Sequence, residues 1–121
     1  MKLFFWTASK AGLPPGTLVA PSEVEKKKPE LTLFTYNSEH NREISLDSAD
    51  AISLADTASV NWLNVNGLGD IDTITAIGAR FGIHDLTLED ILNTGQRPKF
   101  EEHDSYLFLA LKMIYHNQDK T

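Results

Sequence analysis

The segment 105–115, near the end of the 121-residue chain, constrains the fold more than any other part of the sequence. Its alternate residues form two rows, and both rows are mainly apolar: Leu107, Leu109, Leu111, Met113 and Tyr115 in one, and Tyr106, Phe108, Ala110, Lys112 and Ile114 in the other. Strands that are apolar on both sides occur in the middle of a sheet that helices cover on both faces. The segment therefore predicts an α/β fold, a mixed sheet with helices packed on both faces, incomplete at the carboxyl end.

Shorter patterns predict the remaining elements. They are strands at 31–36, 42–46 and 60–65, a short helix after Asp47, a helix between Asp70 and Gly82, and a second short helix that ends at residue 93. Trp62 has the spacing of a core residue in its strand. Residues 1–30 differ from the rest, because they contain Pro14, Pro15, Pro21 and Pro29 and the lysine run 26–28. We expect residues 1–30 to be an irregular lead-in and residues 31–121 to form the α/β domain.

Composition excludes several classes of protein. The chain has no cysteine, which rules out disulfide scaffolds, zinc ribbons and thiol nucleophiles. Its formal net charge of −6 has the wrong sign for binding nucleic acid or an anionic membrane surface. No apolar stretch approaches the ~20 residues of a membrane span, and no signal sequence is apparent. We expect this chain by itself to be soluble and to have no nucleic-acid partner.

The segment 84–90 concentrates side chains that can bind a metal ion: His84, Asp85, Glu89 and Asp90. Two interpretations stay open from spacing alone. Thr87 and Asp90 have the spacing of a capping box, in which acids stabilise the first turn of a helix. The alternative is half of a divalent cation site, since hard cations prefer carboxylate oxygens. A second acidic run, at 101–104, is expected to be a solvated rim.

Four motifs, in order, resemble the amino-terminal cytoplasmic domain of the CorA magnesium transporter family. They are Gly12-Leu13-Pro14-Pro15-Gly16-Thr17-Leu18-Val19, Trp62-Leu63-Asn64-Val65-Asn66-Gly67, Leu88-Glu89-Asp90-Ile91-Leu92-Asn93 after His84, and Gln96-Arg97-Pro98-Lys99 before the segment 106–113. The third and fourth motifs are the specific part of the resemblance. Position 85 is Asp where the family commonly has Pro.

The resemblance implies a homopentameric Mg²⁺ and Co²⁺ channel of the inner membrane, whose membrane helices follow this domain. The domain would lie on the cytoplasmic side, regulate the channel by sensing divalent cations, and not be an enzyme. Its metal ligand would be Asp90, with Glu89 as an accessory, facing a carboxylate of the neighbouring subunit. This chain would then carry half of a weak regulatory Mg²⁺ site, and on its own it is expected to self-associate as a dimer through the segment 105–115.

Two other functions are compatible with parts of the sequence. One is the cytoplasmic domain of a related zinc transporter, against which the intact motifs at 88–93 and 96–99 argue. The other is a stand-alone metal-dependent hydrolase that uses His84, Asp85 and Glu89. The hydrolase needs a closed ligand cluster with an open coordination position.

Overall fold

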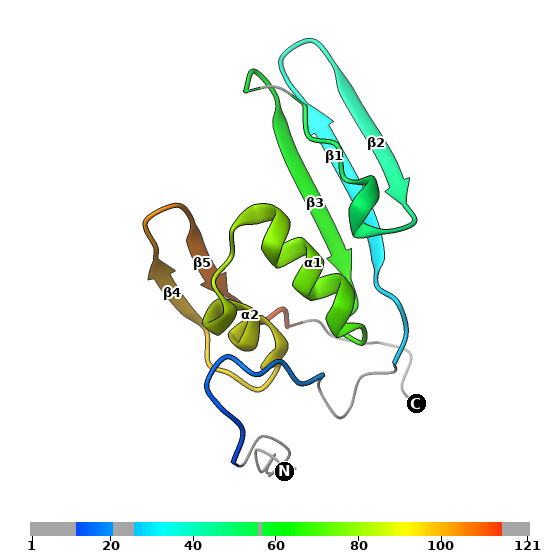
Figure 1. Cartoon of the computed structure of the whole chain (residues 1–121). Helices are drawn as coiled ribbons and strands as arrows, with labels where there is room; N and C mark the ends of the chain where they lie inside the picture. Colours follow the sequence, from blue (N-terminus) through cyan, green and yellow to red (C-terminus); the bar gives the residue numbers. More distant parts are fainter. Residues whose placement is uncertain (1–11, 21–25, 56, 115–121) are drawn as a thin grey trace, which may run out of the picture.

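Three antiparallel strands form the larger sheet of the computed structural model, which describes residues 12–20, 26–55 and 57–114 (Figure 1). β1 (Glu30–Tyr36) lies between β2 (Asn41–Leu46) and β3 (Val60–Asn66). In this register Leu33 is opposite both Ile44 and Leu63, so apolar residues of all three strands share one face. The three strands predicted from β-branched and alternating residues are confirmed.

The helices cover that apolar face. α1 (Ile71–Phe81) lies on one side of the sheet, with the short 3₁₀ turn η2 (Ala49–Ala51) next to it and α2 (Asp85–Leu92) beyond it towards β4 and β5 (Figure 1). The buried core has two adjoining parts, one centred on Leu31, Ile52 and Ile77 and the other on Ile74, Leu88 and Leu92. Gly82 ends α1 in the left-handed conformation, with φ of 67°, as its position after the apolar repeat predicted.

The predicted central strand is instead one arm of a hairpin. β5 (Leu107–Ala110) pairs with β4 (Lys99–Glu102), and the strands are thus divided between two antiparallel sheets. Phe108 is buried, whereas Leu107 and Leu109 are more than half exposed. Within the described residues, then, only one face of β5 is covered. The α/β class is confirmed. The described residues form two antiparallel sheets and not the single mixed sheet that was expected, because β4 supplies a local antiparallel partner that was not predicted.

The outer face of the larger sheet is uncovered in the part of the chain that the structure describes. Trp62 is 60% exposed and contacts Phe34 across the strand pair, with ring centroids 5.6 Å apart. The prediction that Trp62 lies in the core is therefore wrong. Alternation placed it correctly on one face of β3, but the core lies on the other face, with Leu63 and Val65. No helix of the described residues is long and apolar enough to cross a membrane.

Candidate functional site

Helix α2 begins three residues earlier than a capping box at Thr87 requires. His84 is the N-cap residue, and its Nδ1 accepts a hydrogen bond of 3.1 Å from the backbone N–H of Leu86. Thr87 lies inside the helix and is buried, with its Oγ1 2.8 Å from the hydroxyl of Tyr106. The predicted capping box is thus wrong, because the His84 ring already satisfies a free amide of the first turn. Asp90 consequently lies in the last turn of α2.

The side chain of Asp90 binds a lysine of the hairpin. Its Oδ2 accepts a hydrogen bond of 2.6 Å from Nζ of Lys99, the first residue of β4. The same ammonium donates to Oε1 of Glu101 at 2.8 Å and lies 5.5 Å from the ring centroid of Phe108. Both charged groups of the Asp90 pair remain about one third exposed. Lys99 therefore joins α2 to β4 through an ion pair that water can reach.

The two carboxylates change the acidity of this ammonium. The hydrogen bond to Asp90, and then the one to Glu101, raise the pKa of Lys99 above its ordinary value of 10.5, against a smaller opposing effect of desolvation. Lys99 is consequently a permanent cation at neutral pH. Asp90 and Glu101 share this one cation.

Glu89, the neighbour of Asp90, binds a different part of the molecule. Its Oε2 accepts a hydrogen bond of 2.8 Å from the backbone N–H of Gly16, which has a φ of +82°. Leu18, two residues further along, packs against the core part around Ile74. Glu89 therefore connects the segment 12–20 to α2, whereas Asp90 connects α2 to the hairpin.

The side chains of the hydrolase hypothesis do not form the one ligand cluster that it needs. The Nδ1 of His84 caps the helix, Glu89 binds Gly16, and Asp85 is exposed at the first helical position. The described ranges contain no group of three or more His, Asp or Glu side chains that could hold a metal ion.

Sequence reasoning missed Lys99 and Glu101 as site residues. Residues 101–104 were expected to be a solvated rim, but Glu101 binds Lys99, and its Oε2 lies 3.6 Å from Nε2 of His103. The His103 ring stacks on Tyr106, with centroids 4.5 Å apart. The spacing of Lys99 and Glu101, two apart on a strand, is the signal that could have placed both on one face.

A groove of about 360 Å³ lies beside this ion pair, between the end of α2 and β5. Gln96, one of its lining residues, donates from Nε2 to the backbone carbonyl of Asp90. This contact fixes the loop after α2 and leaves the Asp90 carboxylate free to interact with Lys99.

The donor set at Asp90 fits a hard divalent cation. Mg²⁺ is commonly held by one or two carboxylates and keeps several of its waters, which requires ligands that solvent can reach. Asp90 and Glu101 meet that requirement and already converge on one cationic group. Among the described residues, Asp90 and Glu101 are thus two partly exposed carboxylates that meet at one positive charge.

The amino-acid sequence of this chain is similar to that of known proteins. The family model described as "CorA-like Mg2+ transporter protein" matches residues 57–121. The cobalt/magnesium transport protein CorA of Thermotoga maritima is 37% identical over 113 residues, which are 93% of this chain and 32% of that relative. The chain thus spans about a third of the length of the curated relative that it matches.

Proposed function

Because this chain belongs to the family of CorA-like Mg²⁺ transporter proteins, we propose that it is a cytoplasmic, regulatory part of a Mg²⁺ and Co²⁺ transport channel and that its Asp90 binds the regulatory cation. The proposed channel is a homopentamer of the inner membrane, with this domain on the cytoplasmic side. Membership of a transporter family supports a role without catalysis. The observation that carries the proposal is the position of the Asp90 carboxylate. It is partly exposed near the end of α2 and is paired with the ammonium group of Lys99.

Regulation by Mg²⁺ follows from the charges at a contact between two subunits. A Mg²⁺ ion held by Asp90 and a carboxylate of the neighbouring subunit would offset repulsion between two acidic surfaces, since this chain alone has a net charge of −6. Loss of the ion would restore that repulsion and favour a rearranged, open state. Few protein ligands give modest affinity, on the order of millimolar, which suits a sensor of free cellular Mg²⁺.

Glu89 has a supporting role in this proposal. Its hydrogen bond to Gly16 fixes the side of α2 next to Asp90, and its charge adds to the negative field around the ion. This hydrogen bond already engages Oε2 of Glu89, whereas the Asp90 carboxylate is paired with a cationic side chain. We therefore assign the stronger contribution to Asp90 and an accessory one to Glu89.

Limited proteolysis of the complete transporter tests the proposal. Mg²⁺ should protect the parent, and Asp90→Asn should raise the Mg²⁺ concentration for half-maximal protection at least about tenfold, because one ligand is removed. Asp72→Asn is the matched control, since it makes the same charge change at an exposed position of α1 and should leave the midpoint unchanged. Equal midpoints for Asp90→Asn and the parent would show that Asp90 serves only the ion pair with Lys99.

A further inference from the structure

The ammonium of Lys99 occupies the position toward which two carboxylates point. It lies 2.6 Å from Oδ2 of Asp90 and 2.8 Å from Oε1 of Glu101, and these residues come from α2 and β4 respectively. Two carboxylates from different elements that meet at one cation are the donor set expected of a weak Mg²⁺ site. Here the cation is part of the chain itself.

We propose that Lys99 is a tethered internal cation that competes with a divalent cation for the carboxylate of Asp90. Mg²⁺ and the ammonium would bind the same carboxylate, one oxygen of which Lys99 already engages, and their like charges repel each other at so short a range. Binding of the ion would therefore release Lys99 from Asp90, and Lys99 would lower the affinity of the site. The inference rests on the role of Asp90 in the proposed function and adds the group that sets its affinity.

Release of Lys99 gives the competition a structural consequence. Lys99 is the first residue of β4, and its bond to Asp90 connects the β4–β5 hairpin to α2. When Mg²⁺ replaces the ammonium at Asp90, Lys99 keeps Glu101, its neighbour on the same strand. Occupation of the site would thus loosen the hairpin from the helix, which offers a path from cation binding to a change in subunit contacts.

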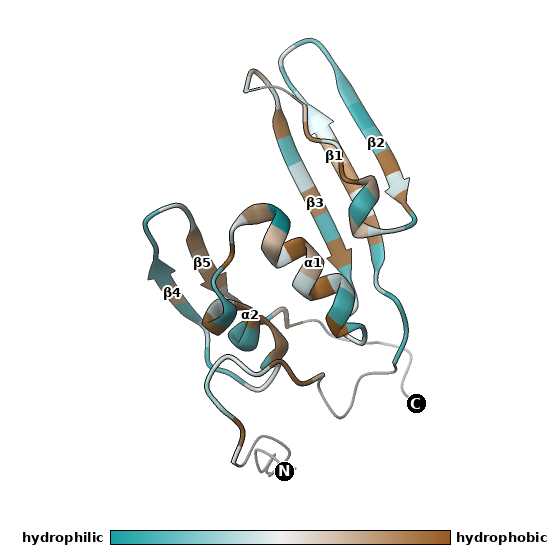
Figure 2. Cartoon of the chain, viewed as in Figure 1, coloured by the Kyte–Doolittle hydropathy of each residue, from teal (hydrophilic) through white to brown (hydrophobic). Residues whose placement is uncertain are grey.

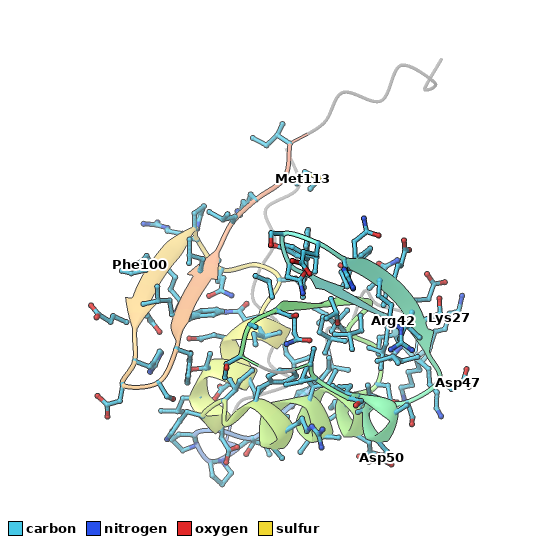
Figure 3. The ribbon with its side chains drawn as sticks, turned by 90° about the horizontal axis from the view of Figure 1, so that it is seen from above. Lys27, Arg42, Asp47, Asp50, Phe100 and Met113 are labelled. Atoms are coloured by element: carbon cyan, nitrogen blue, oxygen red, sulfur yellow. The ribbon has the colours of Figure 1, made fainter. Side chains whose placement is uncertain are left out.

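The direct test measures Mn²⁺ binding, as a paramagnetic substitute for Mg²⁺, by water proton relaxation in this chain. Lys99→Met should bind Mn²⁺ about tenfold more tightly than the parent, because a unit positive charge next to the ion is removed. Lys99→Arg keeps the charge and should stay near the parent. Lys27→Met is the matched control, since Lys27 is exposed and lies at the opposite end of the molecule from the hairpin residue Phe100 (Figure 3).

Lys27→Met changes the net charge by the same amount and should change the dissociation constant less than about twofold, because distant exposed charges are screened. A Lys99→Met affinity equal to that of Lys27→Met would overturn the inference. So would a gain that persists in the Lys99→Met, Asp90→Asn double variant, because the gain would then not come from Asp90.

A measurement on the parent keeps the inference testable if Lys99→Met does not fold. In a Mg²⁺ titration followed by NMR, the side-chain signals of Lys99 should move toward those of a free lysine with the same midpoint as the Asp90 amide. Asp90 shifts without Lys99 shifts would overturn the competition and leave the proposed function standing. If instead the Asp90→Asn variant binds Mn²⁺ as tightly as the parent chain does, both the competition and the proposed function fail.

Discussion

The ion pair of Lys99 has a defined dependence on pH. Because hydrogen bonds to Asp90 and Glu101 raise the pKa of Lys99 above 10.5 in the folded protein, the charged form stabilises the fold. That stability is fully present below 10.5, the unfolded value, and is lost as pH rises through the higher folded pKa. The difference in unfolding free energy between the parent and Lys99→Met should therefore be constant from about pH 7 to pH 10 and shrink above about pH 10.5. Urea denaturation of both proteins at a series of pH values measures this difference in unfolding free energy. A difference that stays the same above about pH 10.5 would show that Lys99 stabilises the fold by packing and not by its charge.

The hydroxyl of Tyr106 satisfies two polar groups near the start of α2. It accepts a hydrogen bond of 3.2 Å from the backbone N–H of His84 and lies 2.8 Å from Oγ1 of the buried Thr87. Tyr106→Phe should lower the free energy of unfolding by about 1–2 kcal/mol, because the buried Thr87 hydroxyl loses a hydrogen-bond partner. Tyr36→Phe, at an exposed position of β1, is the control and should change it by less than about 0.5 kcal/mol. Equal effects of the two changes in denaturation experiments would contradict this role of Tyr106.

Sequence patterns identify only some of the residues of the candidate site. Asp90 could be singled out by its residue type and motif, but its place in the last turn depends on where α2 begins. That start is fixed by the ring of His84, a less common N-cap than Ser, Thr, Asp or Asn. Lys99 and Glu101 could not be paired with Asp90, since the contact depends on a hairpin folding back on the helix.

The two helices approach each other closely at Gly78. A Cβ atom at this position would lie 2.5 Å from Cδ1 and 2.9 Å from Cδ2 of Leu88, which is 2% exposed and has little room to move. Gly78→Ala should therefore destabilise the fold by about 1–2 kcal/mol, even though alanine is the better helix former. Gly95→Ala is the control, because the nearest atom to its Cβ would be 3.8 Å away. Increased stability of Gly78→Ala in urea denaturation would contradict the close packing.

Local patterns predicted the strands and helices of residues 30–92 because each has one clearly apolar face. β4 was missed because only one residue of its sequence, Lys-Phe-Glu-Glu, is apolar. The strand forms through backbone pairing with β5, which a side-chain pattern does not show. The length of the last strand was overestimated for the opposite reason. Apolar residues continue beyond Ala110, yet β5 ends at Ala110, opposite Lys99, where β4 begins. The partner strand and not the composition therefore sets its length.

The outer face of the β4–β5 hairpin is apolar and exposed. Figure 2 shows β5 as apolar and β4 as largely polar. The exposed side chains of this face are Phe100, Leu107, Leu109 and Leu111. Within the described residues β5 has a paired strand on one side only, and it carries no charge that would discourage pairing with another strand, whereas β4 carries three charges.

We therefore expect this chain to form a dimer through β5, because the same apolar strand from two copies can pair about a twofold axis. Leu109→Lys should shift sedimentation equilibrium toward monomer, since it places a charge in the centre of the contact. Leu54→Lys, at an exposed position outside the hairpin, should dimerise like the parent. A parent that stays monomeric at about 0.1 mM, a moderate affinity for protein association, would contradict this expectation.

Binding of Mg²⁺ to Asp90 can be measured by an NMR titration of this chain and its Asp90→Asn variant with Mg²⁺. The parent should show shifts of the backbone amides at 89–91 and 99–101 that saturate with a dissociation constant on the order of millimolar. These shifts should be absent from Asp90→Asn. The same Mg²⁺-dependent shifts in both proteins, or no shift at these positions in the parent, would contradict the proposed role of Asp90.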